Sequence, residues 1–297
     1  MKASFVAYKP RLKKALHIVG GLLALASLYF VGQKLYHDRH DIDLSQLSAQ
    51  FVIVLIVLGG VIGMANICLA LAWHALLRYK SIAVTRRWSI TTYGLSQLAK
   101  YVPGNIAHLA GRQALAVAAG LPGWRLAGVM VLELAIQAVA ASVFGLLVLP
   151  LIVPGIPAWL AAGLFLLATL GGGFAVRRVS RDIAMALLYN GGFLAASASV
   201  FVVILLALMP SPLSVGWLVA IGSSFVIAWL IGFVTPGAPA GIGVRELVLL
   251  TLLGAHLPEQ PLLLAVVLSR LVTVGGDLLY FALVGVARLY HHQETTP

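Results

Sequence analysis

The sequence carries two similar proline-broken segments, QLAKYVPGNIAHLAGR at residues 97–112 and VTPGAPAGIGVRE at residues 234–246. Each contains a Pro-Gly pair, and each has an arginine nine residues after that proline, Arg112 and Arg245. Proline lacks a backbone N–H and glycine permits a reversal, so both segments are expected to interrupt a helix. Paired interrupted helices in the two halves of a membrane protein are the best sequence indication of a transporter's binding site.

The composition predicts a membrane protein. Hydrophobic residues make up 61% of the chain, charged residues make up 10%, and the mean hydropathy is +1.01. Soluble domains average about 25% charged residues. The net charge of +11 lies mainly in short loops beside apolar stretches, so we expect no nucleic-acid partner. Cys68 is the only cysteine, which predicts no disulfide framework, no metal cluster and no cofactor.

The apolar stretches predict one all-α, polytopic transmembrane domain over residues 1–297, with no separate soluble domain. Six stretches are near or above the ~20 residues that a membrane helix needs; they are residues 15–36, 51–77, 126–149, 157–176, 183–209 and 261–290. The first stretch follows a basic run and resembles a signal peptide. It exceeds the usual h-region of about 7–15 residues, so we expect a retained anchor helix.

The two interrupted segments are expected to form re-entrant helical hairpins, over residues 88–120 and 213–257. The arm 88–101 is about 21 Å long as a helix, whereas the bilayer core is about 30 Å thick. The hairpin breaks are expected at Pro103, Gly104, Pro236 and Gly237. In the alternative interpretation, both Pro-Gly pairs are simple inter-helix loops, and residues 213–234 span the membrane fully.

Charge asymmetry predicts the orientation. With six spans, fourteen Lys and Arg residues fall on the side that holds both termini, and only Lys34 and Arg39 fall on the other. The positive-inside rule then places both termini in the cytoplasm of a bacterial-type inner membrane. The two hairpins enter from opposite sides, so they form an inverted repeat, the symmetry that supports alternating access.

Seven charged residues fall at membrane depth, where charges usually face the interior, pair with one another and mark a pathway; they are Lys100, Arg112, Arg245, Arg270, Glu133, Glu246 and Asp277. Their net charge is +1. Helix N-termini after both breaks would add N–H groups and positive dipole ends, so the constellation suits a phosphate. We expect Arg112, Arg245, Lys100, Asn105 and His108 to bind substrate. We expect Glu133, Glu246, Arg270, Asp277 and Gln137 to form a charge network that changes partners.

Each of these residues also has a purely structural interpretation. The three arginines could pair permanently with Glu133, Glu246 and Asp277, and Lys100 could reach the cytoplasmic interface instead. His108 could be a satisfied core residue. Three polar residues are expected to bond neighbouring helices: Asn66, Asn190 and Gln137. Gly275 and Gly276 are expected to be close-packing sites.

The two Pro-Gly segments resemble the signature segments of the lysylphosphatidylglycerol synthase transmembrane family, whose members include flippase domains. Gln97 to Gly104 with Arg112, and Pro236 to Glu246, carry this resemblance, which extends over roughly residues 51–290. It implies lipid translocation, with the hairpins contributing to a headgroup cavity. The sequence differs from two-domain members because it holds no soluble aminoacyl-transferase domain, as in stand-alone members, so lysyl transfer is not expected.

The expected function is therefore a flippase, not an enzyme, that moves a phospholipid or a polyprenyl-phosphate-linked sugar between leaflets. The alternative is an accessory protein that binds a lipid carrier or an envelope-glycan enzyme without transporting anything. No nucleophile elbow or metalloprotease motif supports catalysis.

Overall fold

The computed structural model describes residues 49–101, 107–209, 213–235, 241 and 243–293, and the part of the chain that it describes is helical and contains no strand. The helices are α2 (Ala49–Tyr79), α3 (Arg86–Gln97), α4 (Ala107–Ala118), α5 (Gly123–Phe144), α6 (Leu149–Ile152), α7 (Ala158–Leu166), α8 (Gly172–Val179), α9 (Arg181–Leu208), α10 (Val215–Val234), α11 (Val244–Leu253) and α12 (Glu259–Gln293). A 3-10 turn, Leu98–Tyr101, extends α3, and a second, Gly145–Val148, joins α5 to α6. A π-helical turn, Leu167–Gly171, joins α7 to α8.

Six helical stretches of the described chain are long and apolar enough to cross a membrane. They are Ala49–Tyr79, Gly123–Ile152, Ala158–Val179, Arg181–Leu208, Val215–Val234 and Glu259–Arg288. Five of them match stretches that hydropathy predicts, which confirms a multi-pass α-helical membrane protein. The sixth is α10, which belongs to the second interrupted segment. The N-terminal stretch 15–36 lies outside the described residues.

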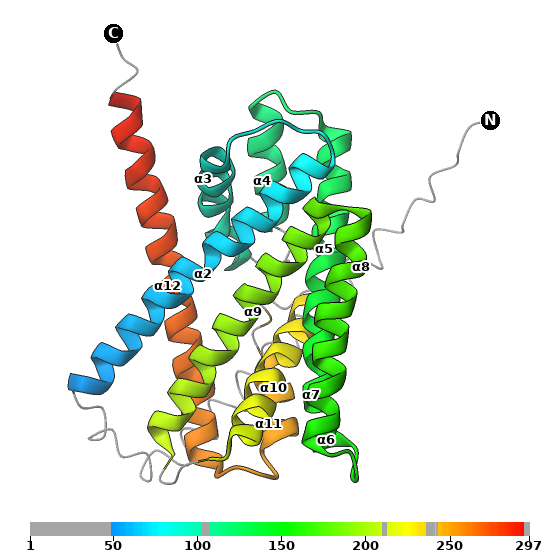
Figure 1. The fold of residues 1–297 in the computed structure, drawn as a ribbon. Helices are drawn as coiled ribbons and strands as arrows, with labels where there is room; N and C mark the ends of the chain where they lie inside the picture. Colours follow the sequence, from blue (N-terminus) through cyan, green and yellow to red (C-terminus); the bar gives the residue numbers. More distant parts are fainter. Residues whose placement is uncertain (1–48, 102–106, 210–212, 236–240, 242, 294–297) are drawn as a thin grey trace, which may run out of the picture.

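The long helices α2, α9 and α12 pack against one another and form the centre of the protein. Around them lie two groups of buried apolar side chains, one that includes Trp73 and one that includes the stacked rings of Phe201 and Phe225. By contrast, α7 and α8 lie at the edge (Figure 1) and leave large apolar side chains such as Leu166 and Phe174 exposed. An apolar outer surface of this kind suits contact with lipid tails.

Small residues let α2 and α12 cross at close range. Gly59 and Gly63 are four residues apart on one face of α2, and both approach Gly276 of α12. A Cβ on Gly276 would lie 2.7 Å from the Gly59 carbonyl oxygen, so the two backbones are in direct contact there. Small residues at this spacing are the usual device for close helix contact in membranes. The crossing brings Asn66 of α2 next to Asp277 of α12.

Two packed helix pairs lie toward opposite ends of the protein. Helices α3 and α4 pack together at one end, whereas α10 and α11 pack together toward the other (Figure 1). At 12 residues, α3 and α4 are each about 18 Å long, too short to cross the bilayer core. At 20 residues, α10 is about 30 Å long, and α11 has 10 residues. The expected breaks, Pro103-Gly104 and Pro236-Gly237, lie outside the described residues, as does Asn105.

Candidate functional site

A central cavity lies where the two helix pairs meet α2, α5, α9 and α12. The empty space at this site is about 830 Å³ when the open solvent at its mouth is counted with it, so the closed part of the cavity is much smaller. Its lining combines charged, polar and aromatic side chains, namely Tyr93, Gln97, Lys100, Tyr101, His108, Gln137, Phe193, Ser197, Phe225, Trp229, Phe233, Arg245, Arg270, Thr273 and Asp277, with Ile62 and Leu69. A cavity with apolar walls and a few convergent polar groups is the usual form of a ligand site.

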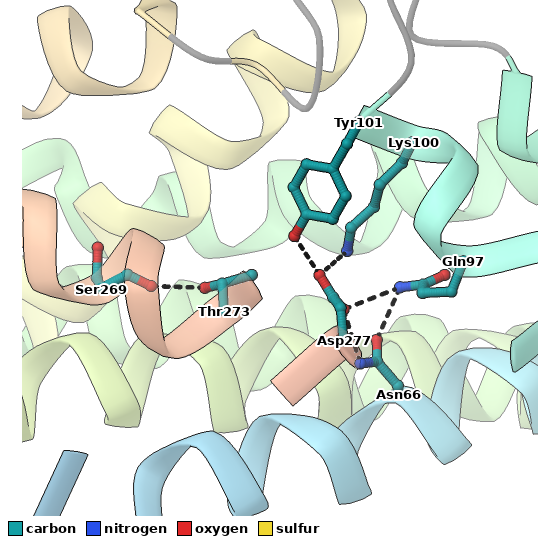
Figure 2. A network of polar contacts seen from close by, with 7 residues as sticks. All are labelled: Asn66, Gln97, Lys100, Tyr101, Ser269, Thr273 and Asp277. Atoms are coloured by element: carbon teal, nitrogen blue, oxygen red, sulfur yellow. Dashed lines mark hydrogen bonds and ion pairs between the residues drawn. The ribbon is translucent and has the colours of Figure 1, made fainter. Parts of the chain in front are cut away.

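Asp277 is the centre of a polar cluster between α12, α2 and the end of α3 (Figure 2). Its Oδ2 accepts a hydrogen bond from the Tyr101 hydroxyl at 2.5 Å and forms an ion pair with Lys100 Nζ at 2.6 Å. Its Oδ1 accepts from Asn66 Nδ2 at 2.9 Å and from Gln97 Nε2 at 3.3 Å. Gln97 Nε2 also donates to Asn66 Oδ1. The carboxylate is fully buried, and four donors satisfy both of its oxygens.

Glu246, which is buried, forms a second ion pair, with the half-buried Arg270 of α12. Arg270 Nε donates to Glu246 Oε1 at 2.5 Å, and Arg270 Nη2 donates to the Gly241 carbonyl oxygen at 3.0 Å. The other carboxylate oxygen, Glu246 Oε2, accepts from the Gly243 backbone N–H at 2.6 Å. Gly241 and Gly243 have φ values of 68° and 86°, which an L side chain rarely adopts. Glycine at these two positions lets the backbone turn back toward the start of α11.

Arg245 is the buried cation of the cavity that has no acidic partner within 4 Å among the described residues. Its side chain is on α11 and lies at the cavity, 7% exposed. The guanidinium carbon is 4.9 Å from the centre of the Phe225 ring, a cation–π contact. Its aliphatic stem crosses Gly232 of α10, where a Cβ would lie 2.6 Å from Arg245 Cγ. The stem is thus held in place, while the charge faces the cavity.

Arg112 has a different environment. It is fully buried, it forms an ion pair with Glu133 of α5, and its guanidinium carbon lies 4.2 Å from the Tyr93 ring centre and 5.1 Å from that of Trp73. It is not part of the cavity lining. This is the arrangement that the purely structural interpretation predicts, in which Arg112 pairs permanently with an acidic residue. Its Nε and Nη1 atoms lack a hydrogen-bond partner among the described residues, so the aromatic rings provide much of their stabilisation.

The remaining predicted polar residues differ in their surroundings. His108 lines the cavity from α4, outside the membrane-spanning helices. Burial, with added repulsion from Arg112 and Lys100, holds the pKa of His108 well below its usual range, so the ring is neutral. Gln137 also lines the cavity, and its Oε1 has no hydrogen-bond partner in the described part of the chain.

The structure corrects several pairings. Lys100 pairs with the buried Asp277 instead of extending away from the cavity, and Arg270 pairs with Glu246 although it shares a helix face with Asp277. The interhelical role of Asn66 is confirmed. Asn190, however, bonds the Ala186 carbonyl of its own helix, because its amide lies within reach of that carbonyl one turn back. Gln137 lines the cavity, and its Oε1 atom bonds no neighbouring helix within the described part of the chain.

Sequence reasoning missed the aromatic wall of the cavity. Phe193, Trp229 and Phe233 form it, with Trp229 and Phe233 stacked at 5.1 Å and Phe193 edge-on to Trp229. The spacing of Trp229 and Phe233, one helical turn apart on α10, is the signal that could have placed them on one face. Tyr101 and Gln97 were also missed, although each lies within the first Pro-Gly segment.

The fold and cavity define a class, a polytopic α-helical membrane protein with a charged central cavity where the helix pairs α3–α4 and α10–α11 meet the long helices. Comparison of the chain with protein-family models gave no match, and comparison with curated proteins gave no significant match.

Proposed function

We propose that this protein is a lipid flippase that moves a phosphate-bearing lipid between membrane leaflets. The observation that carries the proposal is Arg245, a buried cation at the cavity that has no carboxylate within 4 Å among the described residues. A buried charge is costly unless something pairs with it. An anionic headgroup would supply the missing partner, and the planar guanidinium fork suits a phosphate. Polyprenyl-phosphate-linked sugars and phospholipids are the leading substrates.

The proposed transport mechanism depends on the two helix pairs, α3–α4 and α10–α11. We interpret α3–α4 and α10–α11 as re-entrant hairpins of opposite orientation, that is, as an inverted repeat around the cavity. In such a repeat, rocking of one half against the other opens a central site alternately to each side. Glu246, Arg270 and Asp277 would exchange partners during this movement, because their ion pairs link α11, α12 and the end of α3. The resemblance of both Pro-Gly segments to a flippase-containing family supports the same proposal.

The proposed location is the bacterial inner membrane, with both termini in the cytoplasm. The headgroup would enter the cavity, while the lipid tails would remain in the bilayer beside the apolar outer surface. The proposed activity is transport without covalent change of the lipid, so no catalytic residue is assigned.

A liposome assay tests this function. Purified protein is reconstituted into vesicles that carry a tail-labelled fluorescent phosphate-bearing lipid, with a labelled neutral diacylglycerol as the control lipid. A membrane-impermeant quencher then reports the rate at which labelled lipid crosses between leaflets. We expect the protein to accelerate crossing of the phosphate-bearing lipid, and Arg245→Ala to remove that acceleration.

The matched control is Arg87→Ala, which removes an exposed arginine at the start of α3 and should leave the rate unchanged. Arg245→Lys should also slow transport, because lysine keeps the charge but loses the planar fork. Equal rates with and without protein, for every lipid and with or without a proton gradient, would refute the flippase proposal.

The second candidate function is an accessory protein that binds a lipid carrier without moving it. One observation favours it, namely that Lys100 and Arg270 already have intrachain acidic partners, so the cavity can hold a ligand without any change of pairing. In the liposome assay, this alternative predicts lipid binding without acceleration.

A further inference from the structure

The charge balance of the cavity restricts the headgroup that it can hold. Three cations line the cavity in the described part of the chain, namely Lys100, Arg245 and Arg270. Two carboxylates, Asp277 and Glu246, neutralise the first and the last of these. Residues 102–106, 236–240 and 242 carry no charged side chain. The cavity therefore presents one uncompensated positive charge, that of Arg245.

One positive charge matches one negative charge. A phosphodiester carries a single negative charge at neutral pH, whereas a phosphomonoester carries about −1.5 to −2. A pyrophosphate diester carries two. In a site of low dielectric, the second negative charge of a phosphomonoester or a pyrophosphate would remain without a partner, which is costly in free energy. The charge balance thus favours a phosphodiester.

Neither carboxylate is free to receive a headgroup cation. Asp277 already accepts from Tyr101, Lys100, Asn66 and Gln97, and is fully buried. Glu246 accepts from Arg270 at one oxygen and from the Gly243 N–H at the other. An ammonium group would have to displace these donors, and it would also meet the positive charge of Arg245. The cavity is therefore unfavourable for lipids that carry an amine.

The cavity does offer a free hydrogen-bond acceptor for a neutral headgroup. Gln137 lines the cavity and is 6% exposed, and its buried Oε1 atom has no hydrogen-bond partner among the described residues. The Ser197 hydroxyl also lines the cavity. A buried acceptor that lacks a donor is costly, so a ligand hydroxyl that donates to Gln137 Oε1 would stabilise the complex.

We infer that the cavity selects lipids in which a single phosphodiester bears an uncharged, hydroxyl-rich headgroup. Phosphatidylglycerol and polyprenyl glycosyl phosphodiesters share this chemistry. Pyrophosphate-linked and amine-bearing lipids are rejected. The inference deepens the proposed function, on which it rests, because it assigns the substrate class of the same site.

A panel of tail-labelled lipids in the same liposome assay tests this selection. Two arms of the assay carry lipids with the favoured chemistry, phosphatidylglycerol and a polyprenyl glycosyl phosphodiester. The lipid that crosses between leaflets faster shows whether the substrate is a phospholipid or a polyprenyl lipid. Two further arms carry phosphatidylethanolamine and a polyprenyl pyrophosphate sugar. We expect the favoured arms to exceed both of the others by about tenfold or more, which corresponds to about 1.4 kcal/mol. Equal rates for phosphatidylethanolamine or the pyrophosphate lipid would overturn the inference.

Two isosteric variants change the charge of the cavity by one unit in opposite directions. Gln137→Glu makes the net charge zero and should remove the preference for phosphatidylglycerol over phosphatidylethanolamine. Asp277→Asn keeps an amide oxygen for the Tyr101 and Lys100 donors and raises the net charge by one. It should shift the preference toward the pyrophosphate lipid by about tenfold. The matched controls are Gln50→Glu and Asp182→Asn, which make the same changes outside the cavity and should preserve the preference.

The selection can be measured even if the protein moves no lipid. Native mass spectrometry of the detergent-purified protein with an equimolar lipid mixture then gives the relative occupancy of each lipid. Preferential binding of phosphodiesters that Gln137→Glu abolishes would support the inference while refuting transport. Transport or binding that ignores headgroup charge would refute the inference while leaving the proposed function intact. If Asp277→Asn does not fold, Gln137→Glu alone decides the outcome.

Discussion

The two Pro-Gly segments place similar arginines in unlike surroundings. Arg112 forms an ion pair with Glu133 beside two aromatic rings, whereas Arg245 lies at the cavity with no carboxylate within 4 Å among the described residues. Removing one partner of a buried ion pair strongly destabilises the protein, because the other charge then stays buried and unpaired. The first arginine therefore supports the structure, and the second is free to meet a ligand.

This difference predicts unequal effects of the same substitution. Arg112→Ala leaves Glu133 buried and unpaired, so it should destabilise the protein by about 3–5 kcal/mol. Arg245→Ala breaks no ion pair among the described residues and removes only the contacts with Phe225 and Gly232, so it should reduce the stability much less. Unfolding by SDS in mixed micelles measures both, and the double variant Arg112→Ala/Glu133→Ala should recover part of the loss. Equal destabilisation by the two single variants would contradict the distinction.

The position of Arg245 depends on a glycine in the neighbouring helix. A Cβ at Gly232 would lie 2.6 Å from Arg245 Cγ and 3.1 Å from the Gly241 Cα, so Gly232→Ala must displace the arginine stem. We expect this variant to reduce lipid transport nearly as much as Arg245→Ala, while the protein still folds. Gly216→Ala on the same helix meets nothing within 4 Å and is the matched control. Normal transport by Gly232→Ala would show that the stem need not occupy this position.

At this scale, the sequence predicts which charges are buried but not how they pair. Spacing along a helix places Arg270 and Asp277 on one face, and both do line the cavity. It cannot show that Arg270 prefers Glu246, because that choice depends on the turn at Gly241 and Gly243, which brings the start of α11 against α12. Pairing across helices is a tertiary property that no local pattern encodes.

Among the helices, the crossing of α2 and α12 is the contact on which the polar cluster depends. Gly276 touches the Gly59 carbonyl and the Ile62 side chain, and the next residue along α12 is Asp277. Helix contact of this kind relies on close packing rather than on the hydrophobic effect, because lipid tails are equally apolar. Asn66 can reach Asp277 only while the two backbones remain this close.

Gly276→Ala should therefore separate the two helices and weaken the cluster. Its Cβ would lie 2.7 Å from backbone and 2.8 Å from Ile62, contacts that cannot be relieved by a flexible side-chain end. Overpacking of this type costs about 1–3 kcal/mol. Gly275→Ala, one residue earlier, meets nothing within 4 Å and provides the control. The midpoint of SDS unfolding should fall for the first variant and not for the second.

Most of the helices are predictable because hydropathy alone specifies a membrane span. Five predicted spans lie within helices of the structure, with boundaries that differ by a few residues. The length of α10 was less predictable: its 20 residues are enough to cross, whereas the arms of the first segment are short. Pro236 indicates where α10 must end. The number of residues before that proline, however, determines neither the tilt angle of the helix nor the depth to which it enters the bilayer.

Over the whole molecule, the basic residues gather at one end. On the side of the protein where α3 and α4 lie, four other segments also reach the surface (Figure 1). They are the last turns of α2, the first turns of α5, the junction of α8 with α9 and the last part of α12. These segments and the loops beside them carry Arg78, Lys80, Arg86, Arg87, Arg125, Arg177, Arg178, Arg181 and Arg288. The turn between α11 and α12 at the opposite end carries no lysine or arginine. By the positive-inside rule, we expect the basic end to face the cytoplasm, as the proposed orientation requires.

Cysteine labelling tests this orientation on a Cys68→Ser background. Ala83 lies in the loop between α2 and α3, and Ala255 lies in the turn between α11 and α12; both are exposed. A membrane-impermeant maleimide should label Ala255→Cys in intact spheroplasts and Ala83→Cys only in inverted vesicles. Because the positive-inside rule acts on short loops, and all of these loops are short, the two sites should give opposite results. Labelling of both sites from the same side would place α3–α4 and α10–α11 on one face of the membrane, and the inverted repeat that alternating access requires would be lost.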